Sequence, residues 1–376
     1  MAFDSKRIRN ILIAPDKFKT TLSAKEVAGA IRDGIKSDSI QIVLHPMADG
    51  GEGTCNILTA AAGGSMQSVL VSDPLRRQVM ASYGLSVDHT TAWIEMAEAS
   101  GLWRLQQAER HPGRTTTFGT GELILSAIQN GAQEIVLGCG GSATHDGGVG
   151  MAAALGYTFM NNQEQPFLPT GDTLHKIASI DSSSVFEKIQ QTKFSVIADV
   201  TNPLSGPEGA ARTFARQKGA NETEIDFLDN GLNHLHELFS HDPFYRAAKI
   251  EGAGAGGGFP SGAVYFLKAK TYKGIDWVME KTGLFDKIKQ ADLVITGEGQ
   301  LDEQSLRGKV VSGVLSAASK AQKPCWIVCG ANALTEQATV DAGIAKVISI
   351  SSLAGKEESM QRTAYWITRI MGQIKL

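Results

Sequence analysis

The sequence predicts an α/β protein of two domains, in which a Rossmann-like parallel-sheet domain is built from both chain ends and a mixed α/β domain is inserted between them. At both ends of the chain, short apolar runs alternate with helical patterns, which is typical of βαβ units and a parallel sheet. The middle of the chain instead has consecutive strand-like runs separated by polar turns. The length of 376 residues is enough for two domains of ordinary size.

The N-terminal alternation begins with a short buried strand. Residues 11–14 form an apolar run without polar alternation, as expected of a strand that is buried on both faces. Ser23 and Glu26 match the Ser-x-x-Glu capping box, so a helix is expected to begin directly after Ser23. Residues 40–44 predict a second strand, and the glycine-rich loop 47–54 leads into a second helix.

The last hundred residues repeat this alternation. Strands are expected at 292–296, 325–329 and 345–350, and helices at 308–319 and 356–374. A loop, 297–300, is expected directly after the first of these strands because it contains two glycines.

The middle of the chain predicts an antiparallel meander followed by mixed structure. The expected strands are 69–71, 80–87, 91–96, 134–137 and 194–198, and a polar helix is expected at 221–240. We therefore expect the parallel-sheet domain to comprise residues 1–66 and 268–376, and the inserted domain to comprise residues 67–267.

The overall charge is close to neutral, with 36 basic and 39 acidic residues. A nucleic-acid or anionic-membrane partner usually requires a basic surplus, so neither is expected. The apolar run near the N-terminus is too short for a secretory signal peptide, and no run approaches the ~20 residues of a membrane span. The four scattered cysteines predict free thiols. We therefore expect a cytoplasmic protein, for which a homodimer is one alternative.

Glycine is enriched and unevenly distributed. The chain has 41 glycines, of which 19 lie in the segments 49–53, 138–150, 205–209, 252–262 and 297–299. Glycine adopts positive φ and lets a ligand approach the main chain closely, and successive N–H groups in such turns form anion-binding nests. Because there are five such segments and most of them follow an expected strand, phosphate binding is favoured over simple tight turns.

The loop 138–148 is the most specific of these segments. Gly138, Gly140 and Ala143 fit the dinucleotide-binding fingerprint, but the acidic residue expected about 20 positions later is missing. No P-loop pattern is present in the sequence. The candidate nucleotide- or phosphate-binding residues are Gly140, Gly141, Ser142 and Thr144 in this loop, and Gly254, Gly256 and Gly257 in a second loop.

Acidic residues accompany the glycine loops. In parallel α/β sheets, ligands bind beyond the carboxyl ends of the strands, where several of these acids are expected to lie. Carboxylates beside a phosphate site need a neutralising cation, and Mg²⁺ binds carboxylate and phosphate oxygens together. The candidate metal ligands are Asp49, Glu52 and Glu298, and Lys17 and Lys19 can offset further phosphate charge.

Two histidines and two cysteines are expected to have structural roles. No second His or Cys lies at metal-ligand spacing from His145, so a hydrogen bond within its loop is expected rather than zinc binding. His45 is likewise expected to be structural. Cys325 and Cys329 lie four residues apart in an expected strand, on one face, and are expected to be buried.

Taken in order, the loops resemble those of the type-1 glycerate kinase family. The matching segments are IAPDKFK (13–19), LSA (22–24), MADGGEGT (47–54), GGSAT (140–144), DVTNPL (199–204), GAGA (252–255) and DLVITGEG (292–299). The resemblance extends from about residue 8 to near the C-terminus. Lys17 and His145 differ from the Ser and Asn that are usual in the family, and both lie in these loops.

The resemblance implies that the chain transfers the γ-phosphoryl group of ATP to D-glycerate in a cleft between two domains, with Mg²⁺. It favours the 2-hydroxyl and hence 2-phosphoglycerate, and the 3-hydroxyl stays open. Phosphoryl transfer depends on charge neutralisation and in-line positioning. We expect Asp199 to accept the hydroxyl proton, and Lys17 or Lys19 to stabilise the transferring charge. The candidate substrate-binding residues are Asp16, Arg76, Arg212 and Asn202.

Two other functions remain open at this stage. A NAD(P)-dependent hydroxy-acid oxidoreductase would use the dinucleotide fingerprint, but the missing acidic residue counts against it. A non-catalytic nucleotide-binding protein would also explain the glycine loops, but the polar and acidic residues at several separate loops count against it.

Overall fold

The computed structural model describes residues 8–37, 39–306 and 308–374. The chain divides into two compact units, unit 1 with Met1–Asp49 and Ile275–Leu376, and unit 2 with Gly50–Gly274. Residues 50–66 and 268–274, which were expected to belong with the chain ends, lie in unit 2. Residues 268–274 lie there because β11 (Lys270–Lys273) pairs with β10 (Lys193–Ala198) of the unit 2 sheet. Residues 50–66 lie there because helix α2 (Thr54–Ala61) packs against strands of the same sheet.

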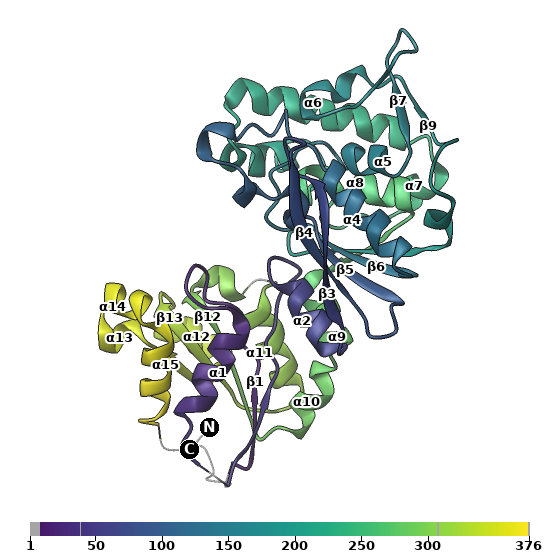
Figure 1. The fold of residues 1–376 in the computed structure, drawn as a ribbon. Helices are drawn as coiled ribbons and strands as arrows, with labels where there is room; N and C mark the ends of the chain where they lie inside the picture. Colours follow the sequence, from purple (N-terminus) through teal and green to yellow (C-terminus); the bar gives the residue numbers. More distant parts are fainter. Residues whose placement is uncertain (1–7, 38, 307, 375–376) are drawn as a thin grey trace. The chain divides into compact units, whose positions relative to one another are not determined.

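Unit 1 is built around a five-stranded sheet with the order β14-β13-β12-β1-β2, in which all neighbours are parallel. Figure 1 shows that the sheet combines N-terminal strands with strands from the C-terminal part of the chain. The expected parallel sheet from both chain ends is therefore confirmed. The strands are β1 (Asn10–Ile13), β2 (Gln41–Leu44), β12 (Leu293–Leu301), β13 (Cys325–Asn332) and β14 (Lys346–Ser349).

The helices of unit 1 follow the sequence pattern closely. Helix α1 (Ala24–Gly34) begins with the expected capping box, in which the Ser23 N–H donates to Glu26 Oε2 at 2.8 Å and the Glu26 N–H donates to Ser23 Oγ at 3.3 Å. It packs against the C-terminal helix α15. The other helices of this unit are α10 (Leu284–Gln290), α11 (Val310–Lys320), α12 (Glu336–Asp341), α13 (Ser351–Ala354), α14 (Lys356–Gln361) and α15 (Thr363–Met371).

The expected loop 297–300 is wrong, because these residues continue strand β12. Glu298 pairs with Cys329 and Gln300 with Ala331 of β13, so both strands extend further than expected. A Cβ atom on Gly297 would lie 2.2 Å from the Val328 carbonyl oxygen. Glycine is therefore needed at this position for close approach of two strands and not for a turn.

His45 is structural, as expected. Its Nε2 lies 2.8 Å from Thr282 Oγ1, which donates its own hydrogen to the Val278 carbonyl at 2.7 Å, so Nε2 is the donor to Thr282. Lys287 Nζ donates to Nδ1 at 2.8 Å. Burial and the nearby Lys287 charge lower the pKa of His45 to about 4, so the ring is neutral at physiological pH.

Unit 2 is built around a six-stranded mixed sheet with the order β11-β10-β6-β5-β4-β3. β3 to β5 form the expected antiparallel meander, and β5, β6, β10 and β11 run parallel. The strands are β3 (Ser65–Ser72), β4 (Gln78–Leu85), β5 (Thr91–Glu95), β6 (Glu134–Gly138), β10 (Lys193–Ala198) and β11 (Lys270–Lys273). A small second sheet contains β7 (Thr158–Met160), β8 (Pro166–Phe167) and β9 (Ser179–Asp181).

One continuous hydrophobic core connects the large sheet of unit 2 to its helices. Phe239 of α6 stacks on Tyr265 of α8 with ring centroids 4.1 Å apart, and both residues belong to this packing. The expected polar helix is α6, with Asn221 as its N-cap. The helices of unit 2 are α2, α3 (Ala97–Ser100), α4 (Phe118–Gln129), α5 (Val149–Ala154), α6 (Glu222–Phe239), α7 (Pro243–Ala247) and α8 (Ala255–Leu267). Helix α9 (Gly274–Lys281) starts at the last residue of unit 2 and otherwise belongs to unit 1.

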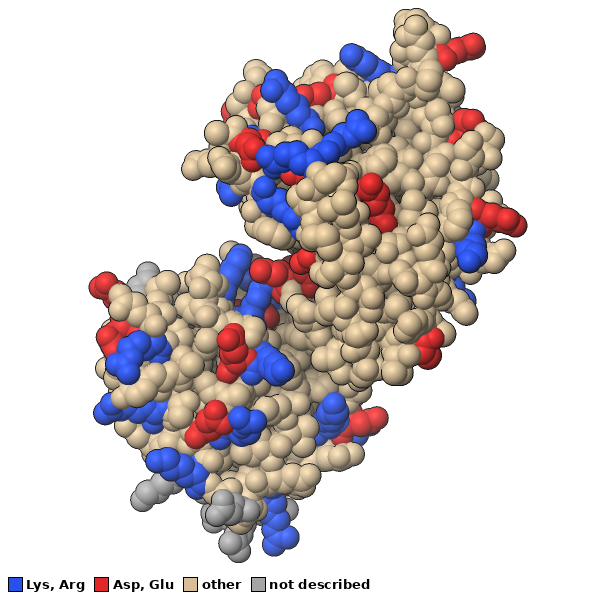
Figure 2. Space-filling view, in the orientation of Figure 1, with Lys and Arg blue, Asp and Glu red and all other residues tan. Residues whose placement is uncertain are grey.

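The surface carries charges of both signs. Figure 2 shows acidic and basic side chains interspersed over the visible face of unit 1. All four cysteines are free and buried, as expected for Cys325 and Cys329. Over the part of the chain that the structure describes, no helix combines the length and the apolar character needed to cross a membrane.

Candidate active site

Three carboxylates of unit 1 lie at the carboxyl ends of neighbouring strands. Asp16 follows β1, Asp49 follows β2, and Glu298 lies in β12, which pairs with β1 on its other side. The Asp16 N–H donates to the Gly297 carbonyl at 2.8 Å, and the Lys17 N–H donates to Asp16 Oδ1 at 2.7 Å. The sheet order thus brings together a predicted substrate ligand, Asp16, and two predicted metal ligands.

Burial and neighbouring carboxylates raise the pKa of Asp16 and of Glu298. Burial is the largest cause of the shift that raises the pKa of Asp16 to about 7, and the charge of Asp49 is the second. The Lys17 N–H and ammonium act in the opposite direction, and the Glu298 charge adds a smaller increase. Burial also raises the pKa of Glu298, against the lowering effects of the Ser305 hydroxyl and the Lys309 charge.

The chemistry of this cluster suits a divalent cation. Glu298 Oε1 is buried and has no hydrogen-bond partner among the described residues. No three acidic, His or Cys side chains converge into a complete metal site within the described ranges. Mg²⁺ usually takes only one or two carboxylates and completes its shell with water and phosphate oxygens. Asp49 and Glu298 therefore fit Mg²⁺ that arrives together with a phosphate ligand.

Replacing Asp16 by Asn is expected to stabilise the protein at neutral and higher pH. The folded-state pKa of about 7 exceeds the ordinary value of 3.8, so ionisation of Asp16 destabilises the folded state progressively as the pH rises from 4 to 7. Asn cannot ionise and still accepts the Lys17 N–H. We expect the free energy of unfolding of D16N, from urea titrations without Mg²⁺, to exceed that of wild type by about 2–4 kcal/mol at pH 8. The gain should shrink towards pH 4.5.

The exposed Asp286 provides the control for this comparison, because its carboxylate pairs only at the surface with Lys289. D286N should change stability little at either pH. A D16N protein that gains no stability between pH 4.5 and 8 would contradict the assigned pKa.

The two predicted catalytic lysines leave β1 directly after Asp16. Lys17 is half-buried and Lys19 is exposed. Phe18 between them is buried, and its N–H donates to the Leu22 carbonyl at 2.9 Å, so the turn is anchored. Both lysines are therefore held beside the carboxylate cluster of unit 1.

In unit 2, four of the predicted loops converge. A Cβ atom on Gly140 would lie 2.9 Å from Gly51 Cα, and one on Gly254 would lie 2.2 Å from the Pro203 carbonyl oxygen. The Gly147 N–H donates to the Gly257 carbonyl at 3.0 Å. The loops 50–53, 138–148, 199–204 and 252–258 are thus packed backbone against backbone, which explains why glycine is needed in them.

The second glycine loop begins helix α8. Gly256, Gly257 and Gly258 have φ values of 57°, 74° and 91°, so the regular helix starts only after them. Three successive residues with positive φ are unfavourable for any residue but glycine. The N-terminus of this helix, together with the loop, provides the partial positive charge and the N–H groups that suit an anion.

Glu95 is a site residue that the sequence reasoning missed. It is buried at the end of β5, and its Oε1 accepts hydrogen bonds from the Gly53 N–H at 2.9 Å and the Cys55 N–H at 2.8 Å. It therefore fixes the loop 50–53 at the start of α2, next to the exposed Glu52. Its position directly at a strand end is the signal that could have found it, because the same rule identified Asp16 and Asp199.

Asp199 and Asn202 lie in the loop that follows β10. Asp199 is exposed, and its charge contributes to raising the pKa of the Cys139 thiol, after the larger effect of burial. It therefore lies close to the loop 138–148. The Asn202 amide donates to the Glu208 carbonyl at 2.8 Å and to Thr213 Oγ1 at 3.2 Å. This side chain holds the neighbouring glycine segment 205–209.

The predicted substrate-binding arginines lie on two further segments of unit 2. Arg76 has φ 66° in the β3–β4 turn and lies over the Phe118 ring, with Cζ 5.7 Å from its centroid. Arg212 forms an ion pair with Asp226 at 2.9 Å. Arg212 is next to Thr213, whose hydroxyl accepts a hydrogen bond from Asn202 of the loop 199–204.

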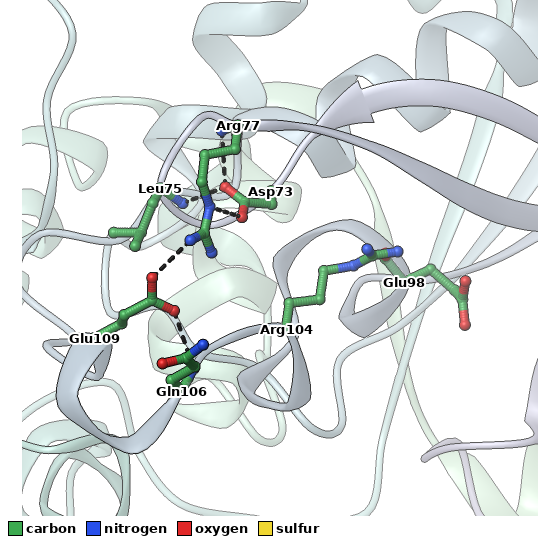
Figure 3. Close-up of polar contacts among 7 residues, drawn as sticks. All are labelled: Asp73, Leu75, Arg77, Glu98, Arg104, Gln106 and Glu109. Carbon is green, nitrogen blue, oxygen red and sulfur yellow. Dashed lines mark hydrogen bonds and ion pairs between the residues drawn. The ribbon is translucent and has the colours of Figure 1, made fainter.

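The arginine next to Arg76 is already engaged. Figure 3 shows Arg77 between Asp73 and Glu109, with Nε donating to Asp73 Oδ2 and Nη1 to Glu109 Oε1, both at 2.6 Å. Asp73 Oδ1 also accepts from the Leu75 N–H at 2.8 Å. Arg77 therefore stabilises the turn, whereas Arg76 keeps its guanidinium outside this network.

Loop 138–148 rests on a buried polar layer. Ser142 and Thr144 are buried, and Lys218 Nζ donates to Ser142 Oγ at 2.8 Å and to the Thr144 carbonyl at 2.7 Å. Asp146 is also buried and accepts hydrogen bonds from Thr117 and from the Gly148 and Gly150 N–H groups. The hydroxyls of Ser142 and Thr144 are therefore closed to solvent here, and the sequence reasoning did not identify Lys218.

The expectation that His145 makes a hydrogen bond within its loop is wrong. Both ring nitrogens are buried without a hydrogen-bond partner among the described residues. Burial, and secondarily the charge of Lys218, lower the pKa of His145 well below its ordinary value, so the ring is neutral. The side chain of His145 is thus buried in the interior and makes no hydrogen bond to the polar groups of its own loop.

Backbone glycine loops and carboxylates at the strand ends of α/β sheets are typical of enzymes that transfer phosphoryl groups. The chain matches the model of the Glycerate kinase family over residues 11–375. It is 42% identical to the glycerate 2-kinase of Escherichia coli K12 over 94% of both chains, and 42% identical to the glycerate kinase of Bacillus cereus over 91% of this chain and 90% of that one.

A crystal structure from Salmonella typhimurium LT2, provisionally described as a glycerate kinase 2, aligns with a TM-score of 0.84. It is 37% identical and covers 97% of each chain. The chain belongs to the glycerate kinase family.

Proposed function

We propose that this protein transfers the γ-phosphoryl group of ATP to the 2-hydroxyl of D-glycerate and releases 2-phosphoglycerate. The observation that carries the proposal is the family match over residues 11–375, which includes every loop described above. The chemistry agrees, because phosphoryl transfer needs positioned backbone donors and charge neutralisation more than covalent catalysis. The free, buried thiols suit a reducing compartment, and we place the protein in the cytoplasm.

In this proposal the loops 138–148 and 252–258 bind the phosphates of ATP. Gly140, Gly141, Gly256 and Gly257 contribute backbone N–H groups, and the regular part of α8, which starts after Gly258, adds its dipole. Gly254 shapes the second loop, because its N–H donates to the Asn202 carbonyl at 3.0 Å. Ser142 and Thr144 act through the conformation of their loop, because their side chains are buried.

The carboxylates have two roles. Asp49 and Glu298, with Glu52 as a further candidate, would hold Mg²⁺, which supplies charge neutralisation for the phosphates when bound. Asp199 accepts the proton of the glycerate hydroxyl. Lys17 and Lys19 stabilise the charge that develops on the transferred group.

Recognition of the glycerate carboxylate and hydroxyls is assigned to Asp16, Asn202, Arg76 and Arg212. A guanidinium can bind a carboxylate through two parallel hydrogen bonds. Arg212 would have to leave its surface partner Asp226, which costs little because exposed ion pairs contribute about 0–1 kcal/mol.

The decisive experiment incubates the protein with ATP, Mg²⁺ and D-glycerate and follows ADP and phosphoglycerate by ³¹P NMR. We expect ADP and 2-phosphoglycerate in equal amounts, and loss of both after chelation of Mg²⁺ with EDTA. A 3-phosphoglycerate signal would overturn the regiochemistry. In a parallel incubation of the protein with D-glycerate and NAD⁺, NADH formation would favour an oxidoreductase. ATP binding without product would favour a non-catalytic protein.

A further inference from the structure

Lys218 is a buried lysine that contacts the loop 138–148. Its side chain lies in a short turn, Arg216–Lys218, and the residue is only 3% exposed. Lysine is almost never fully buried unless it is paired, because removing its charge from water is unfavourable. Its two hydrogen bonds, to Ser142 Oγ and to the Thr144 carbonyl, both end on this glycine loop.

No carboxylate neutralises Lys218 directly. Within the described residues, no ion pair includes this lysine, and Asp146 is the carboxylate whose charge raises its pKa. The oxygens of Asp146 are already used by Thr117, Gly148 and Gly150. When Lys218 is protonated, the loop therefore contacts a positive charge that the protein itself leaves incompletely compensated.

The polar atoms beside Lys218 are also incompletely satisfied. Thr144 Oγ1 and both ring nitrogens of His145 are buried and have no hydrogen-bond partner among the described residues. Such groups are destabilising in a protein interior, and they are commonly retained for a functional reason. Thr144 and His145 belong to the same loop, 138–148, whose backbone is assigned to phosphate binding.

We propose that Lys218 is a positioning residue for the nucleotide phosphates, which fixes loop 138–148 through Ser142 and Thr144 and supplies the positive charge beneath it. This inference rests on the nucleotide binding in the proposed function. It does not depend on glycerate being the acceptor.

The protonation of Lys218 provides a direct signature of this role. Burial lowers its pKa to about 7, against smaller raising effects of Asp146 and Cys139, and His145 beside it is neutral. In the free protein at pH 8, Lys218 is therefore mostly uncharged. An anion bound at the loop favours the charged form, so nucleotide binding is coupled to proton uptake by Lys218.

The test measures binding of the non-hydrolysable nucleotide AMP-PNP with Mg²⁺ by isothermal titration calorimetry. Lys218→Met should weaken nucleotide binding by about tenfold or more, because a charged hydrogen-bond donor is lost from the loop. Ser142→Ala removes one of the two contacts and should weaken binding less. The exposed Lys193 of β10 provides the matched control, and Lys193→Met should bind like wild type.

The double variant S142A/K218M shows whether Lys218 affects nucleotide binding through Ser142 or independently of it. If Lys218 acts through Ser142, S142A should weaken binding much less in the K218M protein than in wild type. Titrations at pH 8 in two buffers of different ionisation enthalpy should show proton uptake in wild type and in K193M, but little in K218M. A change in packing alone would not remove this proton uptake.

Circular dichroism verifies that each variant is folded, and S142A tests the same contact if K218M does not fold. Nucleotide affinity of K218M or S142A equal to wild type would overturn the positioning role. Equal proton uptake in wild type and K218M would overturn the role of the charge. The proposed function fails separately, if wild type binds AMP-PNP but forms no phosphoglycerate from ATP.

Discussion

Replacing Asp199 by Asn is expected to lower kcat by about 10²–10⁴-fold, because general-base catalysis contributes rate enhancements of this size. The amide has nearly the same shape but cannot accept the proton of the glycerate hydroxyl. Affinity for the nucleotide should change by less than about threefold, since the loops that bind phosphate in the proposal remain intact. Steady-state kinetics and calorimetry with AMP-PNP provide the two measurements.

The place of Asp199 in the fold supports this expectation. It directly follows β10, and in the parallel register Ile197 of β10 lies opposite Gly138, where loop 138–148 begins. Ligands of parallel α/β sheets bind beyond this edge. A proton acceptor on this loop therefore lies next to the backbone that is assigned to ATP.

Asp181→Asn serves as the control, because Asp181 is exposed in the small β7–β9 sheet and interacts with its neighbour Ser183. It should leave kcat unchanged. If D199N retains kcat within a few-fold of wild type, Asp199 is not the base.

Replacing Gly257 by Ala is expected to destabilise unit 2 by about 3 kcal/mol or more, because backbone strain and overpacking add. Gly257 has a φ of 74°, and an added Cβ would lie 2.2 Å from the Thr144 carbonyl oxygen and 2.7 Å from His145 Cα. Neither neighbour is a flexible side chain. The substitution should therefore push the loops 138–148 and 252–258 apart and also strain the backbone at residue 257.

Urea titration measures the loss of stability, and calorimetry with AMP-PNP measures the accompanying loss of nucleotide affinity. Gly206→Ala is the matched control, because Gly206 has a φ of 93° but nothing lies within 4 Å of an added Cβ. It should cost only about 1 kcal/mol, the strain of a left-handed alanine. Equal effects of G257A and G206A would mean that the close contact between the loops has no energetic consequence.

Local signals in the sequence predicted most of the elements. The capping box at Ser23 and Glu26 correctly marked the start of α1, because its hydrogen bonds lie within four residues. The meander of β3 to β5 was equally readable, since its turns and alternation are local. The expected loop at 297–300 was wrong, because the sequence does not show whether a glycine permits a turn or the close approach of two paired strands.

The sequence predicted the acids and glycine loops of the candidate site, but not the buried side chains that hold these loops in place. The acids at strand ends and the glycine loops were visible in the sequence because parallel sheets place ligands at one edge. Glu95 was missed although it lies at a strand end, and its hydrogen bonds reach a loop that is distant in sequence. Lys218 carries no such signal, because it acts on Ser142, which is 76 residues away. The burial of both ring nitrogens of His145 likewise follows only from packing.

The sequence by itself determined the α/β class, the parallel sheet drawn from both chain ends, and the glycine-rich loops, because periodicity and glycine spacing are properties of neighbouring residues. The tertiary structure alone decided which glycines allow two loops to pack closely and which allow two strands to do so. It also decided the pKa values of Asp16 and Lys218, both about 7. Burial and the charges of distant residues produce these shifts, and only the folded chain brings them together.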